Sequence, residues 1–178
     1  MAANDPERQS GNGAIFSAMP KHFEVIEVQD AEFLAGDLFR RVFGSDPPTY
    51  PRHFVCLHRS EDGTIRTAGY VHYSAFESMH LGGGLVTDRS IYAIIPPEHR
   101  KDLPHGSIAE YLLVVSLARL VGSNGSFAII SDPRSVEVNV NAGYVPTHVP
   151  KLYAFWKRDF PEEIKRAAAE RVMRIAPF

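Results

Sequence analysis

A chain of 178 residues, 44% of them hydrophobic and 22% charged, can bury one substantial core and is too short for two ordinary domains. Its formal charge of −2 and pI near 6.4 argue against the broad basic surface that holds a phosphate backbone, so we expect no nucleic acid as main partner. The first twenty residues have neither a signal-peptide core nor a membrane-spanning run. We therefore expect a flexible leader over residues 1–20, a single domain over residues 21–178, a cytoplasmic location and no membrane partner.

The first half of the chain has the pattern of one helix among strands. A strand is predicted over residues 23–28, after which Asp30 can cap a helix. Gly44 follows the apolar residues of that helix, where a left-handed C-terminal cap is expected. Residues 53–59 and 65–76 then predict a β-hairpin. The single cysteine, Cys56, lies among apolar residues of this hairpin and is expected to be a small buried hydrophobe.

The next segment contains three consecutive glycines, Gly82, Gly83 and Gly84. They interrupt the regular strand pattern, so residues 81–88 are interpreted as the far end of another hairpin. A fourth, bent strand is placed at residues 90–95. The glycines form either a bulge or mobile turn, or a place where the backbone closely approaches a ligand.

The second half of the chain alternates helices with strands. Residues 107–121 give the strongest helical signal: Ser107 and Glu110 form a capping box, and an apolar surface almost all round predicts burial against a sheet. The remaining predicted elements are a strand over residues 127–130, a helix from Asp132-Pro133 to just before Gly143, strands over residues 144–149 and 152–157, and a last helix from about Pro161. This order predicts an α/β fold with a mixed central sheet of about seven strands and helices on both faces.

The segment that leads into the buried helix is a candidate anion site. A helix start has unpaired N–H groups and a partial positive charge, and Gly106 lets the backbone come close to a phosphate. Arg100 and Lys101 can add positive charge. The alternative is an ordinary strand-to-helix loop with solvated charges.

Two stretches resemble the GNAT superfamily, whose members transfer acyl groups, usually acetyl from acetyl-CoA, to amines. IYAIIPPEHRKDLPHGSIAEYLL is similar to the family's fourth strand, pyrophosphate loop and following helix. SFAIISDPRSVEVNVNAGYVP is similar to its fifth strand, next helix and the Gly-aromatic pair that opens the sixth strand. The resemblance extends from about Phe23 to Trp156. It implies a splayed GNAT-like sheet and acetyl-CoA or another acyl-CoA as co-substrate, with no metal.

The resemblance also implies where an acyl-CoA binds. Backbone groups of Ile94 and Ile95 are expected to pair with the pantetheine arm, and the Ile95 amide to polarise the thioester carbonyl. The pyrophosphate is expected at basic side chains and loop amides, namely Arg100, Lys101, His105, Gly106, Ser107 and Ile108. The loop has one glycine where the family usually has two.

The resemblance leaves the catalytic groups open. Where the family often has a tyrosine that protonates the leaving thiolate, this chain has Asn139, which would only line the cofactor site. Water, Ser135 or Tyr153 would then have to supply that proton, and Tyr144 is expected to serve in packing. Candidates for a base are Glu77, His80 and Asp88, with His72 and Tyr73 on the strand before; each has an ordinary structural role as its alternative. The chain has no H-E-x-x-H or C-x-x-C pattern, so no metal site is predicted.

Two functional hypotheses follow from the resemblance. In the first, the chain is an N-acyltransferase that uses acetyl-CoA or another acyl thioester on a small amine or amino-acid-like acceptor. In the second, it is a catalytically degenerate module that binds CoA or another ligand as a sensor or partner domain. The apolar strand over residues 152–156 adds a possible homodimer surface. Consumption of the thioester in the presence of amines separates the two hypotheses.

Overall fold

The computed structural model describes residues 20–49 and 51–176. The predicted leader lies outside this range except for Pro20. In chain order the elements are β1 (Phe23–Val28), α1 (Glu32–Phe43), β2 (Arg52–Arg59), β3 (Ile65–Phe76), β4 (Met79–Thr87), α2 (Ile91–Ile94), α3 (Pro97–Arg100), the 3₁₀ turn η3 (Pro104–Gly106), α4 (Ile108–Arg119), β5 (Gly125–Ile129), α5 (Pro133–Asn141), β6 (Val145–Pro146), β7 (Leu152–Trp156) and α6 (Glu162–Met173). No helix in the described ranges is long and apolar enough to cross a membrane.

All seven strands form one sheet in the order β1-β2-β3-β4-β5-β7-β6. The first four strands pair antiparallel with their sequence neighbours. β4 and β5 run parallel and share three residue pairs, the last between Gly82 and Ala128. Beyond that pair β4 continues to Thr87 without β5, so the sheet parts there. The predicted α/β architecture with a mixed, splayed sheet is confirmed.

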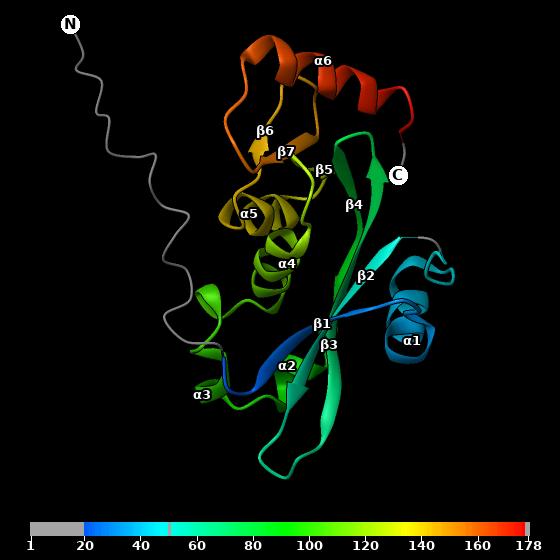
Figure 1. Cartoon of the computed structure of the whole chain (residues 1–178). Coiled ribbons are helices and arrows are strands. Elements are labelled where there is room, and N and C mark those ends of the chain that lie inside the picture. Colours follow the sequence, from blue (N-terminus) through cyan, green and yellow to red (C-terminus); the bar gives the residue numbers. More distant parts are fainter. Residues whose placement is uncertain (1–19, 50, 177–178) are drawn as a thin grey trace, which may run out of the picture.

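Helices cover both faces of the sheet (Figure 1). α1 packs on one face, where Phe39 contacts the ring of Tyr70 on β3. α4 lies on the opposite face, where Leu112 and the β2 residue Phe54 belong to the largest buried cluster. α6 covers the far end of the sheet through Val172, in a separate cluster with β5 and β7. Each helix thus stabilises its own part of the sheet, and the parting between β4 and β5 lies between these parts.

The fourth strand was wrongly placed from the sequence. Residues 79–87 form β4, whereas Ile91–Ile94 is a helical turn that begins where the Asp88 carboxylate accepts hydrogen bonds from the backbone and hydroxyl of Ser90. The glycines were interpreted as breaks because glycine has little strand propensity. Pairing with β3 overrides that propensity at Gly82 and Gly83, and the register shifts between them and Val86.

Most other element predictions are confirmed, although Ala31 and not Asp30 is the N-cap of α1. Gly44 ends α1 with a left-handed backbone, and the Asp132 side chain caps α5 by accepting from two backbone amides. Cys56 is fully buried, and burial raises the pKa of its thiol to about 12, so it is an inert core residue as predicted. The strand expected over residues 144–149 is reduced to Val145–Pro146. β7, considered as a dimer surface, instead lies between β5 and β6, with Leu152 and Ala154 packed beneath α6.

Buried histidines should make the stability of the protein depend on pH. Burial, with a smaller contribution from the charge of His53, lowers the pKa of His72 to about 4. Burial likewise lowers the pKa of His53 and of His80. Each imidazole is therefore neutral in the folded protein at pH values where the unfolded chain, with a pKa of about 6.5, already binds a proton.

We expect the free energy of unfolding to fall as the pH drops from about 6.5 to about 4, with about 3 kcal/mol of that loss attributable to His72. Urea unfolding at several pH values checks this. The variant His72→Gln should lose part of the dependence, whereas His148→Gln, at a partly exposed imidazole, should keep it. The same dependence in wild type and His72→Gln would contradict the assignment to His72.

Candidate functional site

The parting of β4 from β5 opens a cleft of about 300 Å³. One wall is the glycine-rich part of β4 and the other is the end of β5 with the start of α5. The lining residues are Phe43, Val71, Tyr73, Gly82, Gly83, Gly84, Leu85, Leu113, Ala128, Ile129, Ile130, Ser131, Asp132, Ser135, Asn139 and Tyr144. Clefts at such a change of strand pairing are common ligand sites in open α/β sheets.

The three glycines give the cleft a wall made of backbone. A Cβ atom at Gly82 would lie 3.1 Å from the Tyr73 ring and 3.4 Å from the Tyr144 hydroxyl. At Gly83 it would lie 2.7 Å from the His72 ring, and at Gly84, whose φ is +59°, within 2.7 Å of both His72 and Phe39. Rings from β3 and α1 thus occupy the space that side chains on β4 would need. Gly82 and Gly83 pair with β3, whereas the β3–β4 register shifts at Gly84 and Leu85, so the bulge expected from the sequence lies there. The glycines are packed against aromatic rings on one side and leave the backbone of β4 open to the cleft.

A chain of buried hydroxyls crosses the floor of the cleft. The Tyr73 hydroxyl is 2.9 Å from the Ser116 hydroxyl on α4, and the Tyr144 hydroxyl donates to Ser126 Oγ on β5 at 3.0 Å. Burial raises the pKa of both tyrosines, so both phenols are protonated near neutral pH. Because the Tyr144 hydroxyl lies beside Gly82, where β4 and β5 part, it can supply a proton at the apex of the cleft.

Most of the loop amides that were predicted to hold a pyrophosphate already donate hydrogen bonds to other groups of the protein. The N–H of Gly106 donates to Leu103 at 3.0 Å and that of Ser107 to Pro104 at 2.8 Å. The N–H of Ile108 donates to the Tyr92 hydroxyl on α2 at 3.2 Å. An anion can reach these three amides only after the loop rearranges.

A buried carboxylate holds the same loop closed. Glu110 Oε1 lies 2.9 Å from His105 Nδ1, and Glu110 Oε2 accepts a 3.2 Å hydrogen bond from the Asn141 side chain on α5. The predicted capping box is half formed: Ser107 Oγ accepts from the Glu110 N–H, whereas the carboxylate turns to His105. His105 has a positive φ of 47°, which is uncommon for a residue with a Cβ atom. We call the contacts among His105, Glu110 and Asn141 the loop latch.

The residues predicted to bind an acyl-CoA are scattered. Ile94 and Ile95 lie at the end of the helical turn α2, and the Ile95 N–H donates to the Ile91 carbonyl oxygen, so these residues offer no strand edge. The strand that lines the cleft is β4. Arg100 ends α3 with its Nε buried and without a hydrogen-bond partner among the described residues, and Lys101 follows it, exposed. Asn139 alone of the predicted cofactor residues lines the cleft, and its amide donates to the Ser135 carbonyl.

The four predicted catalytic residues do not lie together in the structure. Glu77 is paired with Arg171 on α6, and Asp88 with Arg41 on α1. His80 is buried in β4 opposite Ser126, and Tyr153 lies on β7. None of the four lines the cleft. Their catalytic roles therefore have no support from geometry and stay predictions.

Sequence analysis missed the role of the hydroxyl chain. Tyr73 was named only as a neighbour of candidate bases, and Tyr144 was assigned to packing. The available signal was the register of a β3–β4 hairpin, which places Tyr73 directly opposite Gly82. A glycine facing an aromatic residue across two strands indicates space that is filled by the ring.

Comparison with solved structures gives weak similarities. The AtaT toxin bound to the C-terminus of the antitoxin AtaR is 14% identical, with 85% of this chain and 98% of that chain covered and a TM-score of 0.45. A KacT mutant is 13% identical, with 85% and 99% covered and a TM-score of 0.47. AtaT complexed with acetyl-methionyl-tRNAfMet is 13% identical, with 82% and 99% covered and a TM-score of 0.43. No family model and no curated protein matches the chain.

The strand order and the parting of β4 from β5 agree with what the resemblance in the sequence implies. Similarities below 20% identity and below a TM-score of 0.5 do not assign an activity or a partner to this chain.

The comparisons correct the prediction about partners. We expected a small amine as acceptor and no nucleic acid, with a possible homodimer. The similar structures include AtaT with acetyl-methionyl-tRNAfMet, complexes with DNA and complexes with an antitoxin, whereas AtaTR is also known with acetyl-CoA. The exclusion of nucleic acid and the restriction to small acceptors were wrong, because net charge describes the average surface and not a local binding site.

Proposed function

We propose that this chain is an acyltransferase that takes an acyl group, most simply acetyl, from an acyl-CoA and transfers it to an amine. The observation that carries the proposal is the glycine-walled cleft at the β4–β5 parting, with a protonated Tyr144 hydroxyl beside its apex. A pantetheine arm is slender and contains two amides, so it can lie along an open strand edge as an added strand does.

The chemistry follows from the thioester. The amine nitrogen attacks the thioester carbonyl, a C–N bond forms, the C–S bond breaks, and the leaving thiolate takes up a proton. We assign that proton donation to Tyr144, because burial raises the pKa of its phenol, which therefore still carries its proton when the thiolate forms beside Gly82. The attacking amine loses its own proton to water or to a base on the acceptor. Positioning of thioester and amine in one cleft supplies much of the rate.

The closed loop favours a second candidate, a module that binds a thioester without turnover. The amides of the loop before α4 already donate hydrogen bonds within the protein, and the buried Glu110 places negative charge where a pyrophosphate would have to bind. Both candidates require the same cleft. They differ in whether the bound thioester is consumed.

The loop latch makes a specific prediction about CoA affinity. Glu110→Gln removes the buried negative charge near the α4 N-terminus, so the dissociation constant for acetyl-CoA should decrease several-fold, whereas that for acetyl-pantetheine, which lacks the pyrophosphate, should change little. Isothermal titration with both ligands measures this. Glu98→Gln, an exposed glutamate on α3, is the control. Equal changes for both ligands would show that Glu110 does not act through the pyrophosphate.

The proposed function is tested by thermal unfolding of the full chain with and without acetyl-CoA. A ligand that binds only the folded protein raises the unfolding midpoint. We expect a rise that grows with ligand concentration. No rise at millimolar acetyl-CoA or acetyl-pantetheine would reject the cleft as a thioester site for both candidates.

A further inference from the structure

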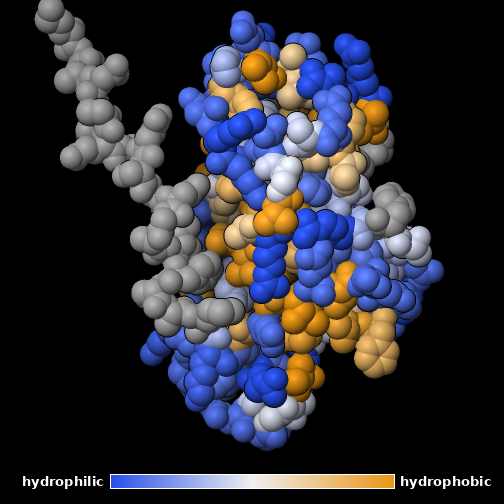
Figure 2. Space-filling view, viewed as in Figure 1, coloured by the Kyte–Doolittle hydropathy of each residue, from blue (hydrophilic) through white to orange (hydrophobic). Residues whose placement is uncertain are grey.

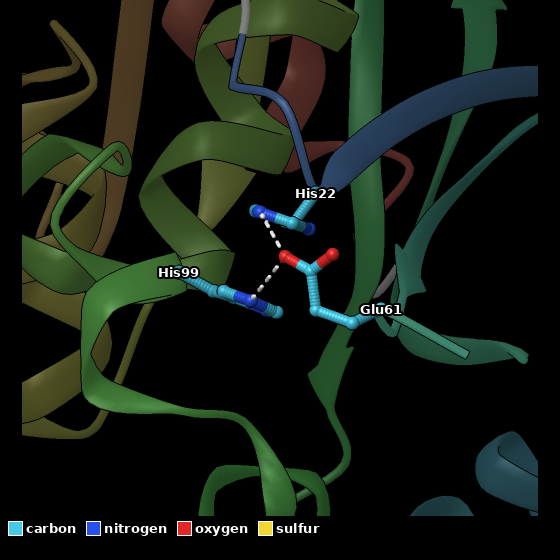
Figure 3. A group of neighbouring side chains, drawn as sticks. All are labelled: His22, Glu61 and His99. Atoms are coloured by element: carbon cyan, nitrogen blue, oxygen red, sulfur yellow. Dashed lines mark ion pairs between the residues drawn. The ribbon is translucent and has the colours of Figure 1, made fainter. Parts of the chain in front are cut away.

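A second cluster of polar side chains lies outside the cleft. It consists of His22, Glu61 and His99, which come from the residue before β1, the β2–β3 turn and α3. Figure 3 shows the Glu61 carboxylate reaching the edges of both imidazole rings. None of the three residues lines the cleft. The cluster therefore needs an explanation separate from the proposed function.

The spacing of the three side chains suits a small metal ion. Glu61 Oε1 is 3.5 Å from His22 Nε2 and 3.7 Å from His99 Nε2, and the ligand atoms of all three residues lie within 4.8 Å of one another. A tetrahedral Zn²⁺ site with bonds of about 2.0–2.2 Å has ligand atoms roughly 3.4 Å apart. The two measured separations from the carboxylate are close to that value.

Hydrogen bonds to the outer ring nitrogens support metal binding at the inner ones. His22 Nδ1 lies 3.3 Å from the Arg59 carbonyl oxygen, which can only accept, so Nδ1 carries the proton and Nε2 has a free lone pair. His99 Nδ1 lies 3.0 Å from His58 Nε2, and donation by His99 would again leave its Nε2 free. Such outer partners orient metal-binding histidines in known sites.

Two features of the present arrangement oppose metal binding. The rings of His22 and His99 are stacked 3.5 Å apart at an angle of 4°, so one must tilt before both lone pairs can point at a single ion. Lys21 Nζ lies 3.8 Å from the same Glu61 oxygen and must move away. Lys21 and Glu61 have side chains that are 76% and 71% exposed, so both can move, whereas His99 is buried and fixes one side of the site.

We propose that His22, Glu61 and His99 bind one Zn²⁺ ion, with water in the fourth position. Imidazole and carboxylate ligands suit zinc, and the three ligands would join β1, the β2–β3 turn and α3. The ion would hold these three segments together and add its binding free energy to folding. Sequence patterns did not indicate this site, since its ligands come from three segments far apart in the chain.

The test uses the full chain without an affinity tag, stripped with a chelator. Zinc titration against a chromophoric competitor should give one site per chain, and zinc should raise the thermal unfolding midpoint. Glu61→Ala and His22→Gln should weaken binding by at least about tenfold, since each removes a ligand, whereas Glu98→Ala and His148→Gln should bind like wild type.

Cobalt substitution gives a second readout that does not depend on stability. Co²⁺ bound at the site should give visible absorption bands that are lost in Glu61→Ala. Zinc affinity that is the same in wild type, Glu61→Ala and His22→Gln would overturn the proposal, as would the absence of a stoichiometric site. Neither outcome bears on thioester binding in the cleft, so this proposal and the proposed function fail independently.

Discussion

Replacing Tyr144 with phenylalanine is expected to lower kcat for acyl transfer by about 10²- to 10⁴-fold, the usual contribution of a positioned proton donor. The phenol oxygen is the only atom lost, so the ring still packs in the cleft and the KM for acetyl-CoA should change little. The stability cost should be about 1 kcal/mol, because the hydrogen bond to Ser126 is removed. Steady-state kinetics with wild type and variant at saturating acceptor measures the effect.

Two further tyrosine variants make the result specific. Tyr153→Phe, on β7 outside the cleft lining, should keep wild-type kcat, although Tyr153 was itself predicted from the sequence as a catalytic residue. Tyr73→Phe removes the neighbouring phenol and should have an intermediate effect, since it alters only the hydrogen-bond chain on the floor. A kcat for Tyr144→Phe within a factor of three of wild type would exclude Tyr144 as the proton donor.

A side chain at Gly82 should weaken acetyl-CoA binding while the protein stays folded. In Gly82→Val the new Cβ lies 3.1 Å from the Tyr73 ring and 3.4 Å from the Tyr144 hydroxyl, so the two methyl groups extend into the narrowest part of the cleft. The valine side chain would take space that the ligand needs, so we expect an affinity loss for acetyl-CoA of about 10- to 100-fold, which corresponds to about 1.4–2.8 kcal/mol. Titration calorimetry with acetyl-CoA checks this, with circular dichroism to confirm that the variant is folded.

The control places a valine side chain elsewhere on the sheet. Ala75→Val lies on β3 at an exposed position that pairs with His80, away from the cleft, and should bind acetyl-CoA like wild type. If Gly82→Val also binds like wild type, the pantetheine arm does not pass the apex of the cleft, and the site must be placed elsewhere.

The sequence predicted the elements whose signals are local. The α4 helix was found from its apolar surface and its Ser107 cap, and α5 from Asp132 and Pro133 at its start. β4 was missed because its glycines carry no strand signal. What makes residues 79–87 a strand is pairing with β3, together with rings that fill the space above the glycines, and both are tertiary effects.

The candidate site was less accessible to sequence analysis than the fold. Asn139 lines the cleft, as follows from the position of α5, and its role in cofactor binding stays a prediction. The amides before α4 were expected to be open, yet they bond to Leu103, Pro104 and the Tyr92 hydroxyl. Whether the loop amides are free depends on groups from other parts of the chain, such as the Tyr92 hydroxyl, and the loop motif does not contain that information. The same holds for His22, Glu61 and His99, which only the folded chain brings together.

The most direct test of the proposed transferase activity is the release of free thiol from acetyl-CoA by the full chain. A thiol reagent follows the release in the presence of amines of increasing size, from amino acids to peptides and aminoacyl-tRNA. We predict thiol release that requires an amine, saturates with it, and falls by at least about 100-fold in Tyr144→Phe. Acetyl-CoA that binds in the cleft but stays intact with every amine would contradict the transferase and leave a thioester-binding module.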